Sequence, residues 1–129
     1  MDWRLFRNEL KYQQRLLDRR ETREAEIAEL VPFRSTIVEL HEARRRHEWT
    51  APREAAEAVV ALREELDATS ERLQAEAPWK ERGHLATRAA RQTDALSKTF
   101  EEWYGFSAGY DPLFSWWVEQ PYEEAAKAL

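Results

Sequence analysis

Residues 52–77, PREAAEAVVALREELDATSERLQAEA, decide the fold class of this chain. Apolar and small side chains recur there every three or four residues, which is the spacing of one face of an α-helix. Alanines lie beside this seam, and small side chains suit close antiparallel packing of helices. Pro52 sits in the first turn and Pro78 ends the segment. The seam consists of Ala55, Val59, Leu62, Leu66, Thr69 and Leu73.

The composition extends the helical prediction to the whole chain of 129 residues, which is long enough for a single domain with one core. Charged residues make up 35% and hydrophobic residues 43%, a mixture typical of long helices. Six tryptophans argue against disorder. We therefore predict an all-α fold, an up-and-down bundle of about four long helices with an aromatic-rich C-terminal segment packed on one end.

Apolar periodicity and the prolines predict the remaining helices. The first helix has a polar middle at residues 18–24, where it could break into two shorter helices. Ion pairs within this polar stretch favour a single helix. The second should bury Phe33, Ile37, Leu40 and Trp49, and Gly105 should end the fourth in a left-handed conformation. The expected ranges are about 2–30, 32–49, 52–77, 84–104, 112–117 and 121–129.

The segment at 109–122, GYDPLFSWWVEQPY, interrupts the helical pattern with crowded aromatic residues and two prolines. Asp111 can cap a short helix that begins at Pro112. Aromatic clusters with polar tips suit ligand clefts and interfaces, but they also plug the ends of bundles. Both interpretations stay open. The residues that we single out for a ligand or an interface are Tyr104, Tyr110, Asp111, Phe114, Trp116 and Trp117.

Charge and residue usage narrow the classes of function. The net charge of −5 comes from 25 acidic and 20 basic residues of interspersed sign, so we expect no nucleic-acid partner. The absence of cysteine excludes thiolate metal sites and suits a cytoplasmic protein. No apolar stretch is long enough for a membrane span.

No catalytic or metal-binding motif stands out in the sequence. His41 and His47 resemble the start of a zinc-peptidase motif, but they lie six residues apart, or about 240° around a helix. Two histidines four residues apart would be needed to hold one metal ion. We therefore predict no catalytic residue, no metal ligand and no cofactor in this chain, and no enzyme activity of its own.

Several phrases of the sequence resemble domain-of-unknown-function family 885 of bacteria and plants. The strongest is GYDPLFSWW at 109–117, together with EWYGF at 102–106 and PY at 121–122; weaker ones are LFRNEL at 5–10, LVPF at 30–33 and EARRR at 42–46. The resemblance implies a longer, largely helical, zinc-metallopeptidase-like protein. Its metal motif would lie far C-terminal of the matched region, so no ligand position is carried over to this chain.

The predicted function follows from this resemblance. We expect a non-catalytic N-terminal helical segment of a metallopeptidase-like protein that forms the wall or lid of a substrate cleft, by analogy with helical peptidases. The last predicted helix lacks a stop signal, so we expect a fragment whose main partner is the rest of a parent chain. The alternative is a free-standing interaction module that uses the aromatic segment 104–122. A small-ligand-binding bundle and a homo-oligomer formed through exposed apolar surface are further expectations.

Overall fold

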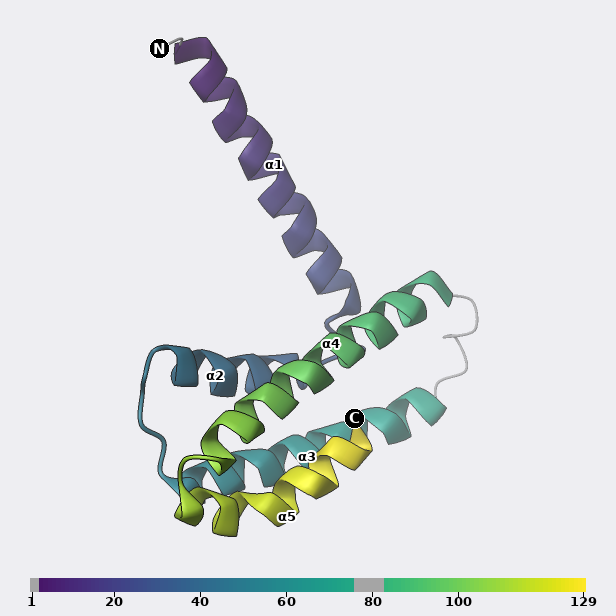
Figure 1. Cartoon of the computed structure of the whole chain (residues 1–129). Coiled ribbons are helices and arrows are strands. Elements are labelled where there is room, and N and C mark those ends of the chain that lie inside the picture. Colours follow the sequence, from purple (N-terminus) through teal and green to yellow (C-terminus); the bar gives the residue numbers. More distant parts are fainter. Residues whose placement is uncertain (1–2, 76–82) are drawn as a thin grey trace.

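The computed structural model describes residues 3–75 and 83–129, and within these ranges it contains five α-helices and no strand (Figure 1). The all-α prediction is confirmed. The predicted end of the third helix at residue 77 lies outside the described residues. The helices are α1 (Trp3–Ile27), α2 (Arg34–Arg45), α3 (Pro52–Ala75), α4 (Gly83–Ala108) and α5 (Pro112–Ala128).

Helices α2 to α5 form an up-and-down bundle, in which each helix runs opposite to the one before it (Figure 1). The most extensive packing joins α3 to α5, and these two helices run side by side in the same direction. The prediction of an antiparallel partner for the α3 seam is therefore wrong. Apolar spacing identifies the face that is buried, but it carries no information about the direction of the helix packed against it.

The core lies along the predicted seam of α3. Val59 and Leu62 are fully buried there, and Val118 of α5 is fully buried as well. Ala55 and Ala125 have no exposed surface, since small side chains let the backbones of α3 and α5 come close together. The predicted seam is confirmed: five of its residues are buried, and Leu73 packs partly buried against the core.

Helix α1 projects from the bundle as a rod (Figure 1). It is one helix through residues 18–24, so the alternative of two shorter helices is wrong. It was expected to belong to the bundle, but its apolar side chains from Trp3 to Leu17 are exposed, and only Ile27 is buried. Helix α5 belongs to the bundle instead and packs along α3.

Helix α2 ends four residues earlier than predicted. The N–H of Glu48 donates to the carbonyl of Ala43 (3.0 Å), and that of His47 donates to Arg44 (3.0 Å), which is the Schellman pattern of a helix end. His47 adopts the left-handed conformation with φ 56°. Because the chain turns here, Trp49 is 81% exposed, and its predicted burial is wrong.

Gly105 does not end α4, which continues to Ala108. No glycine within the described ranges has a positive φ, so Gly105 is not a left-handed terminator. A glycine inside a helix costs only about 1 kcal/mol relative to alanine, which neighbouring packing can offset. The turn after α4 is closed instead by the N–H of Asp111, which donates to the carbonyl of Ser107 (3.1 Å).

Helix α5 is continuous, whereas the sequence predicted separate helices at 112–117 and 121–129. Pro121 lies inside it, although an internal proline costs about 3 kcal/mol in an isolated helix. Val118 and Ala125 are fully buried on either side of this proline. We infer that their packing offsets the loss of the proline hydrogen bond.

The predicted cap of α5 is confirmed. The Asp111 carboxylate accepts from the N–H of Leu113 (2.9 Å), and Pro112 occupies the first turn. The Ser115 hydroxyl donates to the Ala108 carbonyl (3.0 Å), which joins the start of α5 to the end of α4. These contacts hold the aromatic segment against the bundle.

Asp111→Ala is expected to lower the free energy of unfolding by about 1 kcal/mol, because an N–H at the start of α5 loses its acceptor. Urea denaturation followed by circular dichroism measures the change. Asp111→Asn is the matched control, since asparagine caps helices as well as aspartate does. Equal destabilisation by the two variants would contradict a capping role.

Candidate functional site

Several aromatic residues of α4 and α5 form a cluster between these helices, which we call the inner cluster. In the inner cluster the rings of Tyr104 and Tyr122 stack, with centroids 3.9 Å apart and an angle of 5°. Phe114 meets the edge of Trp103 at 5.4 Å and lies 6.2 Å from Tyr104. Phe100 joins the cluster by stacking on Trp103 at 5.6 Å. Two of the predicted site residues, Tyr104 and Phe114, thus pack between α4 and α5.

A groove of about 360 Å³ lies at the end of the bundle, where the loop after α2 meets the α4–α5 turn. We call it the end groove. Three of the predicted site residues line it: Tyr110, Asp111 and Phe114. Tyr110 is 89% exposed, so its ring is available at the mouth of the groove. The remaining lining residues are Leu40, Arg44, His47, Glu48, Trp49, Thr50, Ala55, Trp103, Phe106 and Ser107.

Arg44, Trp49 and Phe106 belong to the end groove but were not predicted as site residues. The Arg44 guanidinium lies over the Phe106 ring, 4.9 Å from its centroid, in a cation–π contact. Phe106 lies within the aromatic segment 104–122 but was not singled out there. The position of Trp49 was not revealed by sequence spacing, because α2 ends early and Trp49 lies in the loop before α3. Histidine is enriched in the left-handed conformation, so His47 was the available signal.

Trp116 and Trp117 do not line the end groove. Their rings meet edge to face with centroids 4.9 Å apart, and Trp116 is 73% exposed. Trp117 lines a second, open groove of about 730 Å³ between α3 and α5, which we call the lateral groove. It is lined by Arg53, Ala56, Glu57, Val60, Ala61, Glu64, Trp117 and Pro121. We call its charged residues, which all belong to α3, the rim and its apolar residues the floor.

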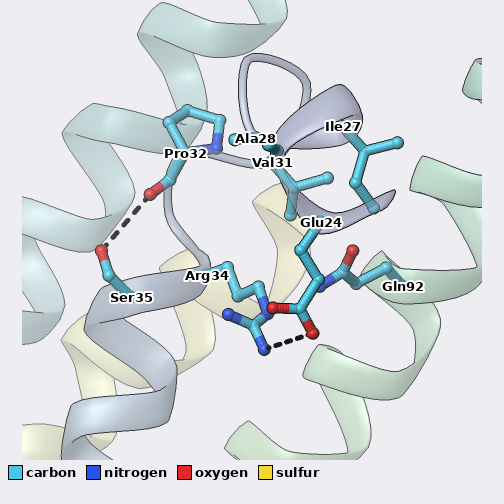
Figure 2. Close-up of a pocket in the computed structure, with 9 residues that line it drawn as sticks. Glu24, Ile27, Ala28, Val31, Pro32, Arg34, Ser35 and Gln92 are labelled. Carbon is cyan, nitrogen blue, oxygen red and sulfur yellow. Dashed lines mark hydrogen bonds and ion pairs between the residues drawn. The ribbon is translucent and has the colours of Figure 1, made fainter. Parts of the chain in front are cut away.

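The junction of α1 with the bundle contains a further pocket of about 290 Å³ (Figure 2). Glu24 and Arg34 point toward each other across it and form an ion pair at 3.5 Å. The floor is apolar, with Ile27 and Val31 buried. These contacts anchor α1 to α2, and an exposed ion pair of this kind contributes only about 0–1 kcal/mol.

Metal-binding side chains are not clustered in the described part of the chain. Over residues 3–75 and 83–129, no three His, Asp or Glu side chains lie close enough to hold a metal ion. His41 lies within α2, whereas His47 lies in the turn beyond it. No helix in the described ranges is long and apolar enough to cross a bilayer.

The inner cluster raises the pKa of two tyrosines above the ordinary value of 10.0. Burial is the main cause for both; the charges of Glu119 and Glu123 also raise the pKa of Tyr104, and that of Glu101 raises the pKa of Tyr122. The fold therefore favours the neutral phenols. Their contribution to stability is complete below about pH 10 and is lost as the pH rises through the raised values.

We expect the free energy of unfolding to fall with rising pH above about pH 10, as the unfolded state loses its phenol protons first. Urea denaturation at stepped alkaline pH measures this fall. In the double variant Tyr104→Phe/Tyr122→Phe, the fall should be clearly reduced. An undiminished fall in that variant would show that other groups cause it.

Comparisons with protein-family models, curated proteins and solved structures find no match for this chain. The resemblance to domain-of-unknown-function family 885 therefore rests on the quoted phrases alone. Most of the strongest phrase, residues 111–117, forms the cap and first turns of α5. The two grooves are thus the features from which a function can be inferred.

Proposed function

We propose that this chain is a non-catalytic helical segment of a larger metallopeptidase-like protein, and that its end groove forms part of the wall of a substrate cleft. The observation that carries the proposal is the convergence of Trp49, Phe106 and Tyr110 on one groove beside Arg44 and Asp111. The metallopeptidase part rests on the family resemblance. Zinc, where the parent protein binds it, is held outside residues 1–129.

The chemistry of the end groove suits an extended peptide. Aromatic walls supply contact area for apolar side chains at low cost in conformational entropy. Arg44 and Asp111 carry opposite charges, and such groups fix the orientation of a polar main chain or of its ends. Ser107 adds a hydroxyl group to the lining. In this proposal the groove positions substrate, and groups elsewhere in the parent protein perform the chemistry.

The parent gene tests the peptidase part of the proposal. Its reading frame is expected to continue beyond codon 129 and to encode a His-Glu-x-x-His motif downstream. A parent frame without that motif would remove the peptidase assignment.

The parent protein tests the role of the groove. Trp49→Ala and Tyr110→Ala are expected to raise KM for peptides at least about tenfold with little change in kcat, because the groove contributes binding that is equal in the ground and transition states. Leu113→Ala is the control, since Leu113 is exposed and does not line the groove. Equal effects of all three variants would contradict the assignment.

A second candidate function is an interaction module that binds another protein through the outer face of α5. The exposed side chain of Trp116 favours this function, because tryptophan is enriched at the centres of protein interfaces. The module should unfold cooperatively when residues 1–129 are expressed alone. Circular dichroism without a cooperative melt would contradict this function.

A further inference from the structure

The apolar stripe of α1 is not covered by any described residue of its own chain. Trp3, Phe6, Leu10 and Leu17 fall on one face of the helix and are all exposed. The contacts of α1 with the bundle lie near its C-terminal end, where Arg88 of α4 pairs with Glu26 (2.9 Å). Residues 3–20 of α1, a helical length of roughly 27 Å, therefore project away from the bundle (Figure 1).

The projecting part of α1 is basic, whereas the helices that border the lateral groove are acidic. Residues 3–20 contain six basic and two acidic residues. Helices α3 and α5 together contain nine acidic and four basic residues. The lining of the groove itself carries two glutamates, Glu57 and Glu64, and one arginine, Arg53. The basic part of α1 and the groove therefore have opposite net charges.

The lateral groove combines apolar surface with charged side chains. Val60, Trp117 and Pro121 provide apolar surface between α3 and α5. On its rim, Glu57 is paired only with the exposed Arg53 (3.1 Å), and Glu64 forms no ion pair with any described residue. An apolar floor beside a charged rim suits the apolar face of an amphipathic helix that has charged residues along its border.

We propose that residues 3–20 of one copy dock into the lateral groove of a second copy, so that the chain self-associates. The stripe from Trp3 to Leu17 would cover the apolar floor, and Arg7 and Lys11, which border the stripe, would face the glutamates of the rim. Residues 3–20 do not occupy the lateral groove of their own chain, because α1 contacts α4 and leads away from α3 and α5 (Figure 1).

A second copy is favoured over an anionic lipid surface by the polar residues of α1. Glu9 and Gln13 form a hydrogen bond of 2.8 Å between the main stripe and the flanking Leu5, Tyr12 and Leu16. A carboxylate at the centre of an apolar face opposes burial among acyl chains.

Sedimentation equilibrium over a range of concentrations, with charge-reversed variants, tests the proposal. Wild-type protein should show concentration-dependent self-association. Two double variants should each weaken self-association about tenfold or more, because attraction between α1 and the rim becomes repulsion. These variants are Arg7→Glu/Lys11→Glu and Glu57→Lys/Glu64→Lys. A mixture of these two variants should associate again, since the acidic α1 of the first fits the basic groove of the second.

Arg45→Glu/Arg46→Glu at the C-terminal end of α2 is the matched control for the Arg7/Lys11 variant, because it changes the net charge by the same amount on exposed residues outside both surfaces. It should leave self-association unchanged. A monomeric wild type, a mixture that stays monomeric, or equal loss in the control would overturn the proposal. Co-sedimentation of monomeric wild type with phosphatidylserine vesicles would assign α1 to lipid instead. Far-ultraviolet circular dichroism verifies that every variant is folded.

Discussion

Val59→Asp is expected to abolish the cooperative unfolding transition of the bundle. Val59 has no exposed surface and lies in the core where α3 packs against α5. An aspartate there would bury an unpaired carboxylate or would have to take up a proton, and each alternative costs several kcal/mol. A domain of this size is stable by only about 5–15 kcal/mol, so we expect a loss above about 4 kcal/mol.

Val60→Asp is the control for this prediction. It makes the same substitution one residue further along α3, so the change in helix propensity is the same. Val60 is 47% exposed, and an aspartate there keeps its contact with water. The loss should stay below about 1 kcal/mol in urea denaturation at low protein concentration. Equal loss in both variants would show that α3 does not bury the face described.

Phe100→Ala is expected to lower the free energy of unfolding by about 3–5 kcal/mol, since it leaves a cavity in the core. Phe100 is only 1% exposed, and its ring contacts Trp103 (5.6 Å) and Tyr122 (4.9 Å). Its removal therefore affects both the α4 and the α5 side of the inner cluster. Urea denaturation monitored by tryptophan fluorescence measures the loss.

Phe106→Ala is the matched control on the same helix. Phe106 is 61% exposed and contacts the Arg44 guanidinium, a contact that contributes about 0.5–1 kcal/mol at an exposed site. The control should therefore cost about 1 kcal/mol or less. Similar losses for the two phenylalanines would contradict the placement of Phe100 in the core.

The candidate site was predicted only in part. Tyr110, Asp111 and Phe114 line the end groove, whereas Tyr104 belongs to the inner cluster and Trp117 to the lateral groove. Their closeness in sequence suggested one site. Tyr104 lies on α4, Tyr110 and Asp111 lie in the turn that follows it, and Phe114 and Trp117 lie on α5. Neighbours in sequence therefore belong to different elements, and within a helix successive side chains point in directions about 100° apart.

The all-α class, the buried seam of α3 and the cap of α5 at Asp111 could be predicted from the amino-acid sequence alone. Each of these depends on residues within a few positions of one another, where helical spacing and hydrogen bonding act directly. The continuation of α5 through Pro121 and the departure of α1 from the bundle became evident only from the packing of the helices (Figure 1). Those outcomes depend on which apolar faces meet: α5 packs along α3, and the burial of Val118 and Ala125 stabilises a helix that contains a proline.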